Sequence, residues 1–273
     1  MIKSRIAKHL DKLAKANQKA LATFITAGDP DLTTTAMLLP LLEKAGVDVI
    51  ELGIPFSDPV ADGATIQRSS ERSLAAGTTL RRVLDMITTI RAEVSVPIVL
   101  MGYCNQFYRY GWQQFTADAV AAGLDGLLLV DLPPEEMDEL YPLACKAGLD
   151  LIFLLTPTSD AERIALVSRK ASGFIYYVTV AGVTGERKNI SESLAAELKV
   201  VKNTVKLPVL AGFGISDPQQ AAQVAGYADG VVVGSAIVKL FEQYQGDELL
   251  EKVTALVSDL KQAIVTPAEN QKQ

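Results

Sequence analysis

A short unit recurs along the chain and constrains the fold more than any other feature of the sequence. In each copy a helical stretch ends in Ala-Gly or Gly, an Asp follows, and a run of Val, Ile and Leu comes next, at 44–50, 122–130, 146–153 and, more loosely, 226–233. Glycine suits the left-handed position that ends a helix. An apolar run without alternation is typical of a parallel strand buried on both faces. The unit therefore predicts helices alternating with parallel strands.

Other apolar runs complete a regular series of strands and helices. The strand candidates are 21–25, 47–50, 96–101, 124–130, 149–153, 174–178, 207–211 and 230–233. Helical patterns occupy 33–45, 79–93, 112–122, 135–147, 160–171, 191–203, 216–225 and 235–262, with a break near Gly246. Eight alternations in 273 residues predict an α/β fold of the (β/α)₈ TIM-barrel type with extra helices. An open doubly wound sheet is the alternative, disfavoured by the even spacing and the missing GxGxxG fingerprint.

We expect a single barrel domain over 1–273. The tail at 266–273 is polar and has no periodic pattern, so we expect it to be disordered. The net charge is −6 and no basic block occurs, which argues against a nucleic-acid partner. No apolar run approaches the roughly 20 residues that cross a bilayer, so a cytoplasmic protein is expected.

Cys104 and Cys145 lie outside any metal or redox motif, and the one histidine, His9, lies on the first helix away from every strand end.

Two connections are longer than a barrel needs, and both follow strands. The first runs from Gly53 to Gly77 and contains a helical pattern at 64–76, and the second runs from about Thr179 to Ile190. Connections that follow strands lie at the C-terminal mouth of a barrel, where active sites of this fold are built. Long loops in compact domains often act as lids. We therefore expect the functional site at this mouth.

A phosphate site is predicted from glycines that follow the seventh and eighth strands. Gly212, Phe213 and Gly214 follow the seventh strand, and Gly234 and Ser235 follow the eighth. In β/α barrels these two loops commonly bind phosphate through backbone N–H groups at a helix start. The alternative is that the glycines only turn the chain and that Ser235 is an ordinary N-cap.

Acid–base chemistry is predicted from the segment ELGIPFSDPVADG at 51–63. Glu51 ends an otherwise apolar strand, which favours a raised pKa, and Asp62 lies in the loop that follows. Two carboxylates in different surroundings can divide acid and base roles. The alternatives are a structural ion pair for Glu51 and ordinary turn chemistry for Asp58 and Asp62.

A third feature is Tyr176 on the sixth strand, followed by the loop 181–187. Gly182 and Gly185 would permit this loop to close over the mouth and exclude water. The alternative is a static surface loop.

The string at 51–63 closely resembles the signature of tryptophan synthase α subunits. Further matching pieces extend along nearly the whole chain, namely Phe24–Pro30, Met101–Asn105, Asp131–Pro133, Gly182–Gly185, Gly212–Ile215 and Gly234–Ala236. The resemblance implies a lyase of tryptophan biosynthesis that cleaves indole-3-glycerol phosphate into indole and glyceraldehyde-3-phosphate. It also implies a heterotetramer with a β subunit that holds pyridoxal phosphate and receives the indole.

The resemblance assigns roles to matching positions. Glu51 corresponds to the general acid and base, Asp62 to the carboxylate that faces the indole N–H, and Tyr176 to the tyrosine beside the reacting centre. The substrate-binding residues implied are Phe24, Met101, Tyr103, Leu128, Leu154, Thr184, Gly185, Gly212, Phe213, Gly214, Gly234 and Ser235. Asp58, Pro59 and Pro133 correspond to the partner interface, and neither a metal nor a cofactor bound to this chain is expected.

Three other functions remain open at this stage. A stand-alone indole-3-glycerol phosphate lyase would use the same residues without a partner. An aldolase or isomerase for another phosphosugar would, if it formed a Schiff base, need a lysine on a strand, and only Lys206 stands at the edge of one. A non-catalytic regulatory subunit would bind phosphate ligands but would not need both Glu51 and Asp62.

Overall fold

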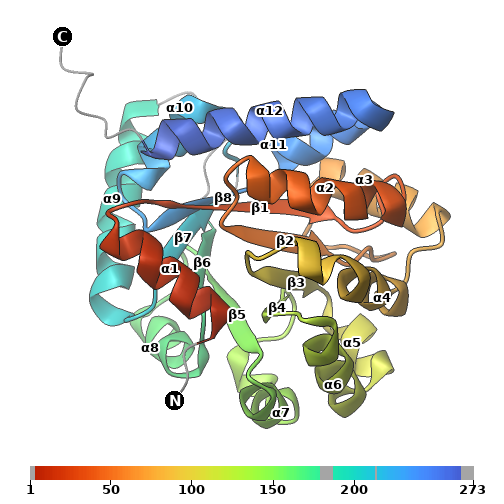
Figure 1. The fold of residues 1–273 in the computed structure, drawn as a ribbon. Helices are drawn as coiled ribbons and strands as arrows, with labels where there is room; N and C mark the ends of the chain where they lie inside the picture. Colours follow the sequence, from red (N-terminus) through yellow and green to blue (C-terminus); the bar gives the residue numbers. More distant parts are fainter. Residues whose placement is uncertain (1–3, 179–186, 213, 266–273) are drawn as a thin grey trace.

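A closed barrel of parallel strands forms the centre of the protein (Figure 1). The computed structural model describes residues 4–178, 187–212 and 214–265. In these ranges the strands are β1 (Ala20–Thr26), β2 (Val49–Gly53), β3 (Ile98–Gly102), β4 (Gly126–Leu129), β5 (Asp150–Leu155), β6 (Ile175–Val178), β7 (Val209–Gly212) and β8 (Gly230–Val233). Each strand pairs in parallel with the next, and β8 pairs with β1. The predicted (β/α)₈ barrel is confirmed, and closure excludes the open sheet.

Helices surround the strands on the outside (Figure 1). They are α1 (Arg5–Lys15), α2 (Leu32–Lys44), α3 (Ala64–Ala75), α4 (Leu80–Ile90), α5 (Cys104–Tyr110), α6 (Trp112–Ala122), α7 (Leu140–Ala147), α8 (Ala161–Lys170), α9 (Arg187–Thr204), α10 (Pro218–Ala225), α11 (Ser235–Val238) and α12 (Gly246–Val265). Short 3₁₀ turns stand at η1 (Arg91–Glu93), η2 (Pro134–Glu136) and η3 (Lys239–Glu242).

The helices differ from the predicted ones at four places. The pattern predicted at 79–93 divides into α4 and η1. The pattern predicted at 135–147 divides into η2 and α7, and the pattern at 235–262 divides into α11, η3 and α12. The last of these divisions includes the break expected near Gly246, which has a φ of 54°. Helix α5 was not anticipated as a separate helix, and Gly111, with a φ of 91°, separates it from α6. Left-handed glycines therefore mark the boundary between α5 and α6 and the start of α12.

The repeated unit has a clear structural reason at its glycine and at its aspartate. Gly46, Gly123 and Gly148 adopt positive φ angles where α2, α6 and α7 end. Asp48 then accepts a hydrogen bond from the N–H group of Leu21 on the preceding strand. Asp125 and Asp229 accept in the same way from Ile98 and Val209. In these three copies the aspartate therefore joins the beginnings of neighbouring strands at the N-terminal end of the barrel. Asp150 of the remaining copy differs, since its Oδ2 atom has no hydrogen-bond partner among the described residues.

The apolar core divides into two parts. The larger part lies between the sheet and the outer helices. The smaller part fills the inside of the barrel with side chains that include Val99, Leu128 and Leu210, and α1 adds Ile6 and Leu10 to it. Interior side chains of a barrel form a packed core, not a pore. Because α1 packs against this interior cluster from the N-terminal side, access to the barrel interior is left at the opposite mouth.

Within the described ranges, no helix combines the length and the apolar character that a membrane crossing requires. The tail that was expected to be disordered lies outside the described residues.

Candidate functional site

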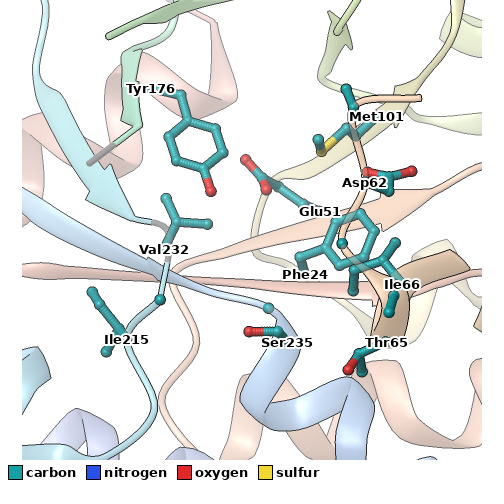
Figure 2. Close-up of a pocket in the computed structure, with 15 residues that line it drawn as sticks. Phe24, Glu51, Asp62, Thr65, Ile66, Met101, Tyr176, Ile215, Val232 and Ser235 are labelled. Carbon is teal, nitrogen blue, oxygen red and sulfur yellow. The ribbon is translucent and has the colours of Figure 1, made fainter. Parts of the chain in front are cut away.

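A cavity of about 280 Å³ opens at the C-terminal mouth of the barrel (Figure 2). Its wall is formed by Phe24, Glu51, Ala61, Asp62, Gly63, Ala64, Thr65, Ile66, Met101, Tyr176, Gly214, Ile215, Val232, Gly234 and Ser235. Small-molecule sites typically occupy about 300–1,000 Å³ and combine apolar walls with a few polar groups. The cavity is near the lower end of that range, so it suits a compact organic molecule.

Glu51 is the most unusual side chain in the cavity. It is fully buried, and neither of its carboxyl oxygens has a hydrogen-bond partner among the described residues. Burial raises the pKa of Glu51 from 4.5 to about 8. At neutral pH the group is therefore mostly protonated and can donate a proton, and the cationic partner that a structural ion pair requires is absent from the described part of the chain.

Tyr176 stands beside Glu51 in the cavity (Figure 2). Burial, and after it the nearby Glu51 carboxyl group, raise the pKa of the Tyr176 hydroxyl. The hydroxyl therefore stays protonated and can donate a hydrogen bond to a bound ligand or to Glu51. Because Tyr176 pairs in register with Leu210 on β7 and Leu154 on β5, its position is fixed by the sheet.

Asp62 reaches the same cavity from the loop after β2, and this loop is held by Tyr103. The Tyr103 hydroxyl accepts a hydrogen bond from the Ala61 N–H group at 3.0 Å and is stacked on Phe56. Burial raises the pKa of Asp62, while a hydrogen bond from Tyr103 acts in the opposite direction by stabilising the carboxylate. Asp62 is only half-buried, so the two carboxyl groups occupy different environments. Such a difference allows one carboxyl group to act as the acid while the other stays ionised.

Phe24 forms an apolar wall of the cavity between two glycines. A Cβ atom on Gly53 would lie 2.4 Å from the Phe24 ring, and one on Gly234 would lie 3.2 Å from the Phe24 Cβ. Larger residues at either position would push the ring into the cavity. Together with Met101 and Ile66, Phe24 provides a surface that suits a flat aromatic group (Figure 2).

The other end of the cavity is formed after β7 and β8. Gly214, Ile215, Gly234 and Ser235 line it, and Ser235 is the first residue of α11. Gly214 adopts a φ of 81°, a conformation that other residues rarely adopt. Glycine has no side chain to cover its backbone, and a helix start presents free N–H groups, so this part of the cavity has the features that a phosphate site requires.

Most of the predicted site residues meet in this cavity. Those that line it are Phe24, Glu51, Asp62, Met101, Tyr176, Gly214, Gly234 and Ser235. Tyr103 acts from the adjoining loop, and Gly212 packs against Tyr176 and Val232. Leu128 is fully buried in the barrel interior, and the partly buried Leu154 packs against the same interior cluster. Thr184, Gly185 and Phe213, with the lid itself, lie outside the described residues.

Several lining residues were missed in the sequence. Thr65 and Ile66 face the cavity from the first turn of α3, and Val232 and Ile215 face it from β8 and from the loop after β7. A hydrophobic residue four positions after Asp62, at a helix start, was a usable signal for Ile66. Nothing in an apolar run distinguishes the inward-facing Val232 from its neighbours.

The residues predicted to form a partner interface lie on the outside of the mouth. Asp58 is exposed, and Pro59 and Pro133 are half-buried. Next to them Val60 is 87% exposed, which is unusual for an apolar side chain. A single exposed valine does not make an interface, so the predicted contact surface stays a prediction.

The fold and the cavity define a class of protein: a (β/α)₈ barrel with a small-molecule site in which a buried carboxylic acid and a second carboxylate face the ligand. The comparisons with known proteins are specific. The family model described as tryptophan synthase alpha chain matches residues 10–265. Curated relatives of the same description from Geobacter sulfurreducens and Geotalea uraniireducens are 58% and 57% identical, and each alignment covers 96% of this chain and 99% and 98% of the relative.

The solved structure of tryptophan synthase subunit alpha from Legionella pneumophila is also similar. It matches with a TM-score of 0.88 and 43% identity over 96% of this chain and 98% of that one. This chain therefore belongs to the tryptophan synthase α-chain family. Membership makes it an enzyme of the lyase class that acts in tryptophan biosynthesis.

Proposed function

We propose that the cavity binds indole-3-glycerol phosphate and cleaves it into indole and glyceraldehyde-3-phosphate, with Glu51 and Asp62 as the catalytic carboxyl groups. The observation that carries this proposal is the buried Glu51 carboxyl group without a partner among the described residues, in a cavity that Asp62 also lines. A buried acid with a pKa of about 8 supplies a proton at neutral pH. A second carboxylate held by Tyr103 accepts a hydrogen bond from the ring nitrogen.

The reaction proceeds in two steps. Glu51 transfers its proton to carbon three of the indole ring, and the positive charge at the ring nitrogen is stabilised by the Asp62 carboxylate. The Glu51 carboxylate then removes the proton of the side-chain hydroxyl group. The bond between the ring and the side chain breaks, and its electron pair returns to the ring to restore indole. The protonated ring is itself the electron sink, so the chemistry needs no group beyond these side chains.

The remaining residues bind the two ends of the substrate. Phe24 and Met101, with Leu128 and Leu154 behind the wall, surround the indole, and Tyr176 lies beside the reacting carbon. Backbone groups at Gly214, Gly234 and Ser235 bind the phosphate, and Gly212 ends the strand that leads to this part of the cavity. The family resemblance adds Phe213 and Gly185 to the phosphate site and Thr184 as a partner of Asp62, and these three lie outside the described residues. This division explains why the apolar residues and the glycines occupy different parts of the cavity.

The family relationship supports a partner as well. The chain pairs with a tryptophan synthase β subunit, in an α₂β₂ complex, through the surface around Asp58, Pro59 and Pro133. The β subunit supplies pyridoxal phosphate and uses the indole, while this chain binds no cofactor of its own. The complex works in the cytoplasm, and the chain forms a single domain.

The experiment measures indole release from indole-3-glycerol phosphate by the chain alone and after addition of the β subunit. Slow release by the chain alone that increases with the β subunit is the expected result. Fast release that the β subunit leaves unchanged would identify a stand-alone lyase. Substrate binding without release under either condition would leave only the regulatory role.

A further inference from the structure

Helix α3, which forms one wall of the cavity, is attached to the barrel by polar contacts. Its buried side chains are Ser69, Ser70 and Ser73. Its N-cap, Gly63, makes no side-chain capping hydrogen bond within the described residues. A helix with a polar buried face gains little from the hydrophobic effect, which is non-directional. Its position therefore depends on directional hydrogen bonds and ion pairs.

The first of these contacts joins α3 to the loop after β1. The Arg72 Nε and Nη2 atoms donate to the two carboxylate oxygens of Asp29 at 2.8 and 2.7 Å. The Ser69 hydroxyl donates to the same carboxylate at 2.6 Å, and Asp29 is 1% exposed. A two-point guanidinium–carboxylate contact fixes orientation as well as distance. Asp29 therefore holds the middle of α3 in one position against β1.

The second contact joins α3 to the segment after β8. The Arg68 Nε and Nη2 atoms donate to the two carboxylate oxygens of Glu242 in η3 at 2.8 and 3.2 Å. Arg72 also approaches Glu242, with its Nη1 atom 3.8 Å from Oε1. Because η3 directly continues α11, this ion pair connects α3 to the helix that begins with Ser235. Arg72 is shared by both contacts, so the four charged groups form one network.

The two helices that this network joins are neighbours and form adjoining parts of the cavity wall (Figure 2). α3 contributes Thr65 and Ile66, and α11 contributes Ser235 at the phosphate end (Figure 2). The network does not line the cavity: Arg68 lies within one turn of Ile66, and Arg72 and Glu242 lie about two turns beyond Ile66 and Ser235. Since helices are stiff over such distances, the spacing between Ile66 and Ser235 follows from the geometry of the ion pairs.

We propose that Asp29, Arg68, Arg72 and Glu242 are positioning residues that set the distance between the indole wall and the phosphate end, and so select the length of the substrate. This assignment rests on the proposed function for the identity of the two ends. A ligand that bridges both ends detects the distance between α3 and α11. A ligand that occupies the phosphate end alone does not.

The test compares inorganic phosphate with indoles joined to phosphate by two, three or four methylene groups. These linked indoles lack the hydroxyl that the retro-aldol step needs, so calorimetry on the full chain measures binding alone. We expect the wild type to prefer the three-carbon linker by roughly tenfold or more, the value of one methylene in a fitted pocket. In Arg68→Glu and in Glu242→Arg, that preference falls below about threefold while phosphate affinity stays unchanged.

The double variant with both changes reverses the ion pair and should restore the preference. Asp29→Asn combined with Arg72→Met removes the buried ion pair without leaving a lone charge. This variant should also reduce the preference for the three-carbon linker to below about threefold. Arg163→Met, which breaks an ion pair with Glu135 far from α3, is the matched control and should keep the preference.

Two results would overturn the assignment. If the network variants keep the wild-type length preference, the network does not set the spacing. If phosphate and all linked indoles weaken equally, the residues only maintain the fold. A wild-type chain that binds none of the linked indoles would instead refute the proposed function, and the assignment with it.

Discussion

Two carboxyl groups only three residues apart, one just before strand β2 and one on it, differ in whether they have hydrogen-bond partners. Asp48, at the N-terminal end of the barrel, accepts hydrogen bonds from the Leu21 N–H group and from Lys261 at 2.7 and 2.6 Å, and it also contacts His9. Glu51, at the mouth, is fully buried and has no hydrogen-bond partner among the described residues. One end of the strand therefore satisfies its carboxylate, and the other end does not.

This difference shows that the two ends of the barrel have different tasks: the N-terminal end stabilises the fold, and the mouth carries the functional groups. A buried polar group without a partner costs free energy of folding, about 1–3 kcal/mol and more if it is charged. At the N-terminal end the same kind of group contributes to strand pairing instead. Asp125 repeats the arrangement with Arg5, Arg91 and the N–H group of Ile98. Glu51 leaves both carboxyl oxygens without a hydrogen-bond partner among the described residues, whereas at the N-terminal end Asp150 leaves only its Oδ2 atom without one. The fully unpartnered carboxyl group of Glu51 therefore lies at the mouth, where a ligand can use its proton.

The largest effect is expected from Glu51→Gln. The amide keeps the shape of the side chain but cannot transfer a proton, and general acid–base help is worth roughly 10²–10⁴-fold in rate. We expect kcat for indole release to fall by about that factor while phosphate binding survives. Stopped assays of indole and calorimetry with inorganic phosphate measure the two quantities. Near-normal turnover in this variant would remove Glu51 from the mechanism.

The second prediction concerns the pH dependence of the free energy of unfolding. The pKa of Glu51 is about 8 in the folded protein and 4.5 when solvated, so the folded state holds the proton more tightly. The resulting stability is fully present below about pH 4.5 and is lost as the pH rises through 8. Glu51→Gln lacks this loss. We expect the free energy of unfolding of the wild type, relative to the variant, to fall by about 4 kcal/mol at most from pH 5 to pH 9.

Urea unfolding of both proteins at several pH values measures this difference. Each pH value supplies its own control, because all other titrating groups are common to the two proteins. Curves that remain parallel over the whole range would show that Glu51 is solvated or paired, contrary to its burial in the structure.

The smallest effect is expected at the other end of the strand. Asp48→Ala leaves the Leu21 N–H group and Lys261 without their acceptor, and we expect the free energy of unfolding to fall by about 2–3 kcal/mol. Because the site is at the far end of the barrel, kcat should stay within about twofold. Asp48→Asn keeps an acceptor for the N–H group and should lose less stability. A large loss of kcat in a folded Asp48→Ala protein would contradict the separation of the two ends.

Much of the architecture was accessible from the sequence because it depends on local signals. Apolar runs and helix-ending glycines predicted the strands and their order, and the long connections located the mouth. The prediction failed at α5 (Cys104–Tyr110), a helix of seven residues that is too short to show a clear apolar period. The apolar character of Leu128 likewise did not show that it belongs to the cluster inside the barrel.

The sequence by itself determined that eight strands would alternate with helices, and that Glu51, Asp62 and the glycines after β7 and β8 would meet at one end, because strand direction brings the C-terminal ends together. Only the tertiary structure decided which carboxyl groups have partners. Asp29 and Arg72 are 43 positions apart, and Arg68 and Glu242 are 174 apart. Such contacts depend on which segments the closed barrel brings together, and no local sequence pattern encodes them. The same is true of the Glu51 carboxyl group, which has no hydrogen-bond partner among the described residues.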